Sequence, residues 1–328
     1  MKIYILAFLL SIGFSVLFGF ILIPILKKFK IGQNVLCYVT EHKNKSGTPT
    51  MGGLFFVLST VITYLIFSKG EKFLSSIALL ISVSFLIVGF LDDFIKIKFK
   101  RNLGLTPLQK TVFMVAISII ASLFAFRNGF NFVFLPFVNK TLYLGVFSII
   151  LNVFVFLATV NGANLLDGLD GLLGGSSSII FLALSGIILL ELTNYQSIYL
   201  VDSEYKNLAL LSIIFAGGLM GYLVFNVKNA SVFMGDTGSL SIGGAVASIS
   251  IFSGNTFYIP FIAFSYVLSV VSVIIQVVYF KKTKKRVFKM APIHHHYQMK
   301  GFSESKISYV YALITLIISL ILILCLTR

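Results

Sequence analysis

Five of the six aspartates lie at the ends of long apolar segments, and their carboxylates are the first candidates for chemistry. They are Asp92, Asp93, Asp167, Asp170 and Asp236. Carboxylates are costly beside lipid and repel one another, so several of them gathered at one membrane face require a cation. The pattern therefore predicts a divalent cation and a phosphate-bearing substrate.

Asp92 and Asp93 end one of these apolar segments. Acids at a helix C-terminus oppose the helix dipole, which favours cations there, so a functional role is better supported than a solvated helix end. Adjacent helical residues point about 100° apart. We therefore expect one carboxylate to face a cleft and the other to lie beside it, in two different roles.

A segment rich in glycine, asparagine and aspartate runs from Asn161 to Gly171 (NGANLLDGLDG). Asp167 and Asp170 are three residues apart, which places them on one face if the segment is helical, and the glycines let the backbone approach a ligand closely. The segment lacks the spacing of an EF-hand loop. A simple turn is the alternative, but the segment has no Lys or Arg to neutralise its acids.

The segment from Asn226 to Ser239 carries Gly235 and Gly238 on either side of Asp236, just before another apolar segment. Asp236 could ligate a metal while free N–H groups at the helix start hold phosphate oxygens. The alternative is that Asp236 is only an N-cap, which aspartate performs well. From this segment alone, both interpretations stay open.

Three consecutive histidines, His294, His295 and His296, lie in the polar loop 281–306. They make a poor zinc site because neighbouring side chains diverge. Imidazoles that donate hydrogen bonds to phosphate fit the pattern better, with a solvated loop as the alternative.

The composition requires a membrane protein. The chain has 328 residues, of which 58% are hydrophobic and 11% charged, and its mean hydropathy is +1.00, whereas soluble domains carry roughly 25% charged residues. We expect an all-α polytopic bundle forming a single domain over 1–328, with about ten spans. They are approximately 3–26, 51–68, 73–91, 107–126, 144–163, 172–190, 208–225, 239–254, 257–280 and 307–327.

The distribution of positive charge predicts the topology. If the first loop faces the cytoplasm, most of the 26 Lys and Arg residues lie in cytoplasmic loops. The positive-inside rule then places both termini outside and all the motifs above on the cytoplasmic face. Topology and anionic membrane lipids explain the net charge of +15 better than binding to nucleic acid does, so we expect no nucleic-acid partner.

Smaller features add little chemistry. The first apolar segment is long enough to span and lacks a clear cleavage site, so it is expected to be a membrane helix rather than a signal peptide. Cys37 and Cys325 fall on opposite faces in this topology, which excludes a disulfide within the chain. Gly217 and Gly221 form a small-xxx-small pair that more often packs helices inside a bundle than marks a dimer, and a homodimer stays open.

Five segments carry a resemblance to a known family. They are Gly47 to Gly53 (GTPTMGG), Leu91 to Asp93 (LDD), Asn161 to Gly171, Phe233 to Leu240 (FMGDTGSL) and Ala291 to His296 (APIHHH). In this order they are similar to segments of the phospho-N-acetylmuramoyl-pentapeptide transferases, over essentially the whole chain. The aspartate motifs alone resemble the wider superfamily of polyprenyl-phosphate N-acetylhexosamine-1-phosphate transferases, and the first and last segments resemble the muramoyl-pentapeptide branch.

The resemblance implies an activity and roles for particular residues. It implies transfer of phospho-N-acetylmuramoyl-pentapeptide from its UDP carrier to undecaprenyl phosphate, giving lipid I and UMP with Mg²⁺, at the bacterial inner (cytoplasmic) membrane. Catalytic roles fall to Asp92, Asp93, Asp236 and His294, and the metal ligands would be Asp236 and Asp167. Substrate contacts would come from Lys45, Thr50, Lys110, Asn164, Asp167, Asp170, Asn226, Phe233, Gly235, His295 and His296, with Phe233 as an aromatic wall for uracil.

Several alternatives stay open from the sequence. A transferase of the same superfamily that uses UDP-N-acetylglucosamine would keep the aspartates, and a transporter could also hold membrane carboxylates, although transport sites lie near the bilayer midplane. Either an aspartate attacks first, or Asp92 deprotonates the lipid phosphate. Residues 34–42 depart from the pattern of the family, as does Gln298, which stands where relatives usually have Glu.

Overall fold

Long apolar helices make up most of the chain. The computed structural model describes residues 1–28, 47–99, 104–135, 140–194 and 202–326, and the statements below concern these residues. The long helices are α1 (Lys2–Lys28), α2 (Gly53–Phe67), α3 (Phe73–Lys98), α4 (Pro107–Arg127), α5 (Phe147–Leu166), α6 (Leu172–Asn194), α7 (Asp202–Asn226), α8 (Gly235–Phe252), α10 (Phe264–Thr283) and α12 (Glu304–Leu326). Shorter elements are β1 (Phe132–Leu135), β2 (Lys140–Tyr143), η3 (Thr256–Tyr258), α9 (Ile259–Ile262) and α11 (Ile293–Gln298).

The expectation of a polytopic helical membrane protein is confirmed. Among the described residues, 8 helices are long and apolar enough to cross a membrane, namely α1, α3, α4, α5, α6, α7, α10 and α12. The predicted spans 51–68 and 239–254 correspond to α2, with 15 residues, and α8, with 18 residues. At 1.5 Å per residue α2 extends about 22 Å, which is less than the roughly 30 Å of a hydrocarbon core.

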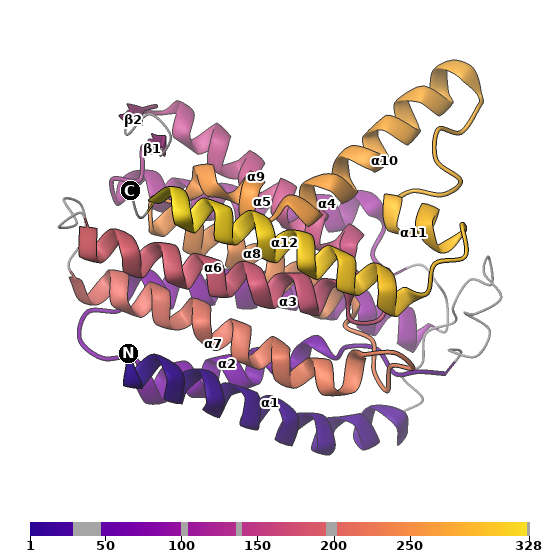
Figure 1. Cartoon of the computed structure of the whole chain (residues 1–328), viewed down its shortest axis with the longest axis horizontal. Helices are drawn as coiled ribbons and strands as arrows, with labels where there is room; N and C mark the ends of the chain where they lie inside the picture. The colour runs from indigo at the N-terminus through magenta and orange to yellow at the C-terminus, as the bar shows by residue number, and fades with distance from the viewer. Residues whose placement is uncertain (29–46, 100–103, 136–139, 195–201, 327–328) are drawn as a thin grey trace.

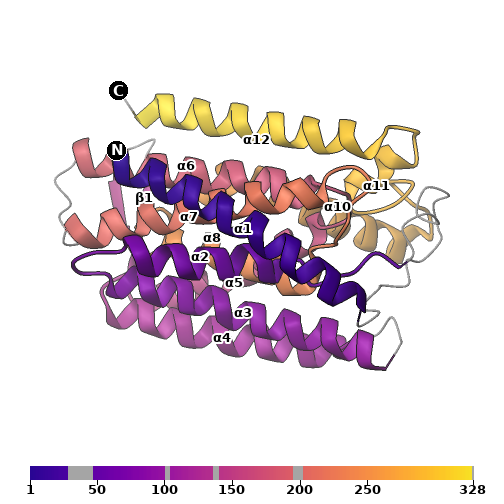
Figure 2. The same cartoon turned by 90° about the horizontal axis from the view of Figure 1, so that it is seen from below.

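Helix α8 forms the centre of the bundle. All of its residues from Thr237 to Phe252 are buried, and α3 and α5 pack against it. Its sequence is rich in glycine, serine and alanine, which lets neighbouring backbones approach closely. Figure 2 places α12 and α4 on opposite faces of the bundle. From Thr237 onward, α8 is therefore enclosed by protein.

The pair Gly217 and Gly221 packs inside the bundle, as predicted. A Cβ atom at either position would meet backbone oxygens of α1, those of Phe8 and Ile12. The pair therefore brings α7 against α1 within one chain.

The predicted span 257–280 was wrong as one continuous helix. Pro260 lies in the first turn of α9, where its missing N–H costs nothing, and Ala263 then leaves helical dihedrals, with φ −99° and ψ 33°. Helix α10 begins at Phe264 and projects away from the bundle (Figure 1). Neither proline nor glycine lies at Ala263, so the residue types did not predict a bend there.

The two ends of the bundle differ in character. Both termini lie at one end, and α11 lies at the other (Figure 1). The hairpin of β1 and β2, which pairs Phe132 with Tyr143 and Leu135 with Lys140, is at the end of the termini. At the α11 end, the last turn of α3 meets the first turn of α8. The polar residues discussed next lie there.

Candidate active site

Three carboxylates from two helices, two of them buried and the third half-buried, converge at this end of the bundle. Asp92 and Asp93 belong to the last two turns of α3, and Asp236 belongs to the first turn of α8. Each offers one oxygen that lies within 4.8 Å of the others. Asp92 is 3% exposed and Asp93 is 2% exposed. Both carboxylates are therefore largely shielded from water.

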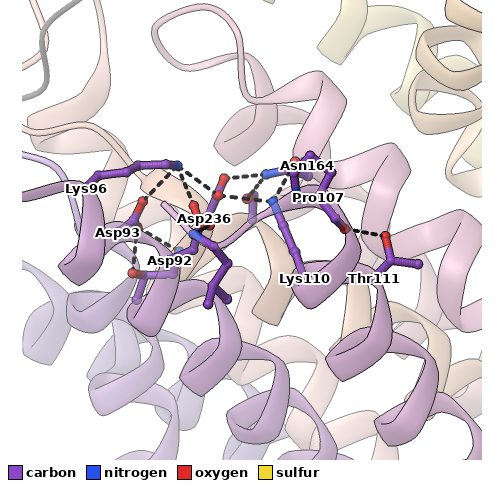
Figure 3. Close-up of polar contacts among 11 residues, drawn as sticks. Asp92, Asp93, Lys96, Pro107, Lys110, Thr111, Asn164 and Asp236 are labelled. Carbon is purple, nitrogen blue, oxygen red and sulfur yellow. Dashed lines mark hydrogen bonds and ion pairs between the residues drawn. The ribbon is translucent and has the colours of Figure 1, made fainter. Parts of the chain in front are cut away.

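Two lysines compensate this charge. The Nζ atom of Lys96 lies 2.6 Å from Oδ2 of Asp92, 3.6 Å from Oδ1 of Asp93 and 3.0 Å from Oδ2 of Asp236. Lys110, from α4, reaches the same Oδ2 of Asp236 at 3.0 Å. Figure 3 shows the two ammonium groups converging on Asp236 from different helices. Two cations thus already balance part of the acid cluster.

Neutral donors fix the orientation of each carboxylate. Asn164 of α5 donates from Nδ2 to Oδ1 of Asp236 at 2.7 Å. Thr237 donates to Oδ2 of Asp93 from its backbone N–H at 3.0 Å and from its hydroxyl at 2.7 Å. The backbone N–H of Leu105 donates to Oδ1 of Asp92 at 2.8 Å. Asp92 and Asp93 therefore do have different partners, as adjacent helical residues should.

Asp167 adds a fourth carboxyl beside this cluster. It caps the C-terminus of α5. Burial raises the pKa of Asp167 to about 8, and the charges of Asp236, Asp93 and Asp170 raise it in the same direction. Burial and neighbouring negative charges both favour the protonated form of a carboxyl. The raised pKa of Asp167 therefore indicates that the protein does not fully compensate the negative charge around it.

This donor set fits a divalent cation. Oxygen ligands from carboxylates are those that Mg²⁺ prefers, usually one or two carboxylates together with substrate phosphates. Asp92, Asp93 and Asp236 present their oxygens close together, and Asp167 lies near enough to them for its pKa to be raised by their charge. A bound divalent cation would remove the repulsion that these acids otherwise share.

Two distant loops form one wall beside the acids. The backbone N–H of Phe233 donates to the carbonyl of Pro49 at 2.7 Å, and Gly52 donates back to the carbonyl of Phe233 at 2.9 Å. Gly235 has a φ of +72°, which favours glycine, and a Cβ atom there would collide with Oδ2 of Asp93 and Oγ1 of Thr50. Thr50 is buried, and its hydroxyl has no hydrogen-bond partner among the described residues. Thr50 and Gly235 thus belong to the site.

Asn226 and Asp170 join the glycine-rich segments to each other. The side chain of Asn226 accepts from the N–H of Gly171 at 3.1 Å and donates to the carbonyl of Val232 at 2.9 Å. Oδ2 of Asp170 accepts from the N–H of Ala230 at 3.2 Å. Both side chains thus hold the loops that carry Asp167 and Asp236.

His294 and His295 pack onto the segment that contains Asp167. A Cβ atom at Gly168 would lie 2.5 Å from Nε2 of His294 and 2.9 Å from Nε2 of His295, so any larger residue there would displace the two imidazole rings. His294 is fully buried, and neither of its ring nitrogens has a hydrogen-bond partner among the described residues. Burial, reinforced by His295, lowers the pKa of His294 well below its ordinary value. A neutral imidazole whose donor and acceptor both lack partners is suited to a polar ligand.

His296 lies differently from its neighbours. Its Nδ1 accepts from the N–H of Lys289 at 3.0 Å, and its ring packs against Phe288 and Tyr297. These contacts are within its own loop. The structure therefore brings His294 and His295, but not His296, onto the segment that carries Asp167.

Lys45 and residues 34–42 lie outside the described residues. The structure adds Lys96, Thr237 and Ser239, none of which we had predicted; the hydroxyl of Ser239 accepts from Asn164 at 2.9 Å. Lys96 had a detectable signal, since it follows Asp93 by three residues and Asp92 by four on the same helix. Thr237 and Ser239 lie in the segment 226–239 singled out above, but their individual roles depend on partners distant in sequence.

The fold and the site define a polytopic membrane protein with a centre of acids and lysines, suited to a divalent cation, at one end of its bundle. Residues 75–254 match glycosyl transferase family 4, and residues 45–57 match the phospho-N-acetylmuramoyl-pentapeptide-transferase signature 1.

Three curated relatives are named phospho-N-acetylmuramoyl-pentapeptide-transferase. The chain is 42% identical to that of Clostridium botulinum (strain Eklund 17B / Type B) over 316 residues, which covers 96% of this chain and 94% of the relative. It is 40% identical to that of Clostridium novyi (strain NT) over 324 residues, 98% of this chain and 96% of the relative. It is 41% identical to that of Caldanaerobacter subterraneus subsp. tengcongensis over 312 residues, 95% of both chains.

The chain therefore belongs to the phospho-N-acetylmuramoyl-pentapeptide transferase family. It is a multi-pass membrane enzyme of bacterial peptidoglycan synthesis, acting at the step that forms lipid I. The family predicted from the five sequence segments is confirmed.

Proposed function

We propose that the chain transfers phospho-N-acetylmuramoyl-pentapeptide from UDP to undecaprenyl phosphate. An oxygen of the lipid phosphate forms a bond to the phosphorus that carries the sugar. The bond from that phosphorus to the bridging oxygen of the diphosphate breaks, and UMP leaves with the electron pair. Lipid I and UMP are the products. The observation that carries this proposal is the convergence of Asp92, Asp93 and Asp236 with Lys96 and Lys110.

The proposal assigns each of these groups a task. Asp92 and Asp93 receive the lipid phosphate, and the proton lost from that phosphate, where it carries one, passes to a carboxylate of this pair. Lys96 and Lys110 neutralise charge on the diphosphate as the UMP phosphate separates. In phosphoryl transfer the protein mainly positions groups and stabilises charge, and this site contains groups for both tasks.

Mg²⁺ is the proposed cofactor, with Asp236 and Asp167 as its ligands. When bound, it would neutralise the diphosphate oxygens and make UMP a better leaving group. Asn164 supports this assignment, because its amide holds one oxygen of Asp236 at 2.7 Å and fixes the direction of the carboxylate. Ligands oriented in this way by outer partners bind metal more strongly.

The UDP-sugar is proposed to lie along the wall formed by the loops around Thr50 and Phe233. Phe233 is half-buried and would stack on uracil. The hydroxyl of Thr50 and the ring nitrogens of His294 are buried and have no hydrogen-bond partner in the part of the chain that the structure describes, so a polar substrate would satisfy them. Lys45, Lys110, Asn164, Asp170, Asn226, Gly235, His295 and His296 keep the substrate-contact roles predicted from the resemblance.

The orientation in the membrane is proposed from the loops. Lys281, Lys282, Lys284, Lys285 and Arg286 follow the exposed apolar part of α10 at the end of the bundle that holds the site. Positive loops are retained in the cytoplasm, so this end faces the cytoplasm and both termini face outside. Membrane lipids surround the apolar belt. A homodimer stays a prediction that the mass of the detergent-solubilised particle would measure.

Release of UMP in detergent tests the proposed function. The purified chain receives undecaprenyl phosphate, Mg²⁺ and either UDP-N-acetylmuramoyl-pentapeptide or UDP-N-acetylglucosamine. We expect release with the first donor and little with the second. A preference for UDP-N-acetylglucosamine would assign the chain to another branch of the superfamily, and no release with either donor would contradict the proposal.

A further inference from the structure

Glu304 is a buried carboxylate outside the acid cluster, and the mechanism above does not use it. It begins α12 and is buried. An acid in the first turn of a helix is usually explained by the helix dipole, and it then tends to face water. The carboxylate of Glu304 instead lies between α11 and the segment containing Asp170, which the dipole alone does not explain.

Both oxygens of Glu304 hold groups from other parts of the chain. Oε2 accepts from the backbone N–H of Asp170 at 3.2 Å, and Oε1 accepts from Nε2 of Gln298 at 3.4 Å. One helical turn further along α12, Ser308 donates from its hydroxyl to the carbonyl of Asp170 at 2.9 Å. The first two turns of α12 therefore hold both backbone polar groups of one residue.

These contacts continue into the site on two sides. Gln298 places its Oε1 atom 3.0 Å from Nδ1 of His295. An amide oxygen can only accept, so Nδ1 of His295 carries the proton and Nε2 faces Gly168. On the other side, the carboxylate of Asp170 holds the N–H of Ala230 at 3.2 Å. The loop after Ala230 leads directly to Asp236.

We propose that Glu304, assisted by Ser308, is a positioning residue for the sugar-nucleotide donor. It locks the histidine segment 293–298 against the segment 167–171, so that two regions far apart in the sequence form one side of the donor site. The inference rests on the function proposed above. It deepens that function by assigning α12, which contributes none of the three clustered acids, to donor recognition rather than to the transfer step.

Replacement of Glu304 by Gln is the sharpest perturbation. The glutamine side chain keeps one acceptor oxygen, but its NH₂ group must then face either the N–H of Asp170 or the NH₂ of Gln298. Because both of these groups are donors, one of the two hydrogen bonds is lost and replaced by a repulsive contact between two donors. Since hydrogen bonds to charged groups are the stronger ones, we expect a rise in KM for the UDP-sugar of about 10-fold or more. We expect kcat to change less than about 3-fold, and KM for undecaprenyl phosphate to stay unchanged.

Glu191→Gln is the matched control. Glu191 lies near the C-terminal end of α6, and its carboxylate also accepts two hydrogen bonds from distant residues. Asn255 donates to it at 2.9 Å and Tyr258 at 3.4 Å. A general loss of stability from neutralising such a carboxylate would appear in both variants. Only the Glu304 variant should change KM for the donor.

Hydrogen exchange supplies a readout that does not depend on turnover. When the backbone N–H of Asp170 loses its acceptor on Glu304, that amide should exchange faster. Peptides covering 167–171 and 293–298 should therefore exchange faster in Glu304→Gln than in wild type or Glu191→Gln. If Glu304→Gln does not fold, Ser308→Ala decides the question, with a smaller effect in the same direction.

Three results separate the possible failures. Unchanged donor KM and unchanged exchange in the Glu304 and Ser308 variants would overturn the positioning role. An equal rise in KM in Glu191→Gln would overturn it too. A wild-type chain that releases no UMP would contradict the proposed function, while faster exchange at 167–171 would still support the lock itself.

Discussion

Removing the positive charge of Lys96 should destabilise the fold, because this lysine compensates the clustered aspartates. Its ammonium group contacts Asp92 at 2.6 Å and Asp236 at 3.0 Å, and its side chain is 20% exposed. Replacement by Met keeps most of the stem and removes the charge. Loss of one partner of a mostly buried ion pair costs about 3–5 kcal/mol, because the remaining acids are left uncompensated. We therefore expect Lys96→Met to be less stable than wild type in EDTA by about this amount.

Magnesium should restore part of this stability. A ligand that binds only the folded state, at about 100 times its Kd, stabilises it by about 2.7 kcal/mol. Lys96→Met has no competing ammonium among the acids, so it should also need less Mg²⁺ for half-maximal stabilisation than wild type. Turnover should nevertheless fall by about 100-fold or more, since removal of one charge-stabilising donor from an active site typically has that effect.

The assay is thermal unfolding in detergent, with EDTA and with a Mg²⁺ titration, alongside UMP release. Lys98→Met is the control, because Lys98 is exposed two residues further along α3 and its Nζ lies over the ring of Phe99. An equal Tm for Lys96→Met and Lys98→Met in EDTA would refute the reasoning. So would a Tm for Lys96→Met that Mg²⁺ does not raise.

Further predictions concern the histidine segment and the topology. His294→Ala should lower turnover with UDP-N-acetylmuramoyl-pentapeptide by at least about 10-fold, because positioning is most of the catalysis in phosphoryl transfer; wild-type turnover in the variant would remove the role. Burial holds the pKa of His294 below its ordinary value, so the unfolded chain binds a proton first as the pH falls. Wild-type stability should therefore decline below about pH 6.5, the unperturbed pKa of histidine, and thermal unfolding of His294→Ala should show less of this decline. In a chain without other cysteines, an impermeant thiol reagent added to intact cells should label Lys140→Cys and not Ser305→Cys, and the reverse pattern would invert the topology.

Much of the fold followed from residue types. Apolar runs of the right length predicted the helices. Backbone polar groups in the hydrocarbon core must be hydrogen-bonded within the protein, which favours helices, and the thickness of the core sets how long those helices are. The bend at Ala263 was missed, since it depends on how α9 and α10 pack rather than on a proline or glycine at that residue. The sequence pattern also did not predict the length of α2, which is shorter than the predicted span 51–68.

The site was predictable where its chemistry is local. The aspartates stood out because carboxylates at the ends of apolar segments are costly, and the structure brings three of them together. Thr237 and Glu304 were not predictable, because each meets a partner more than a hundred residues away in the chain. His296 carried the same signal as its two neighbours. Only the folded structure shows that His296 forms its hydrogen bond within its own loop.

The dependence of UMP release on Mg²⁺ in wild type and in Asp236→Asn tests the central claim most directly. The reaction contains UDP-N-acetylmuramoyl-pentapeptide and undecaprenyl phosphate in detergent, with Asp202→Asn as a control at an exposed acid of α7. The acid cluster predicts that wild type and Asp202→Asn turn over only with Mg²⁺, and that Asp236→Asn is folded and inactive at any Mg²⁺ concentration. Full turnover of wild type in excess EDTA, or wild-type turnover of Asp236→Asn, would contradict it.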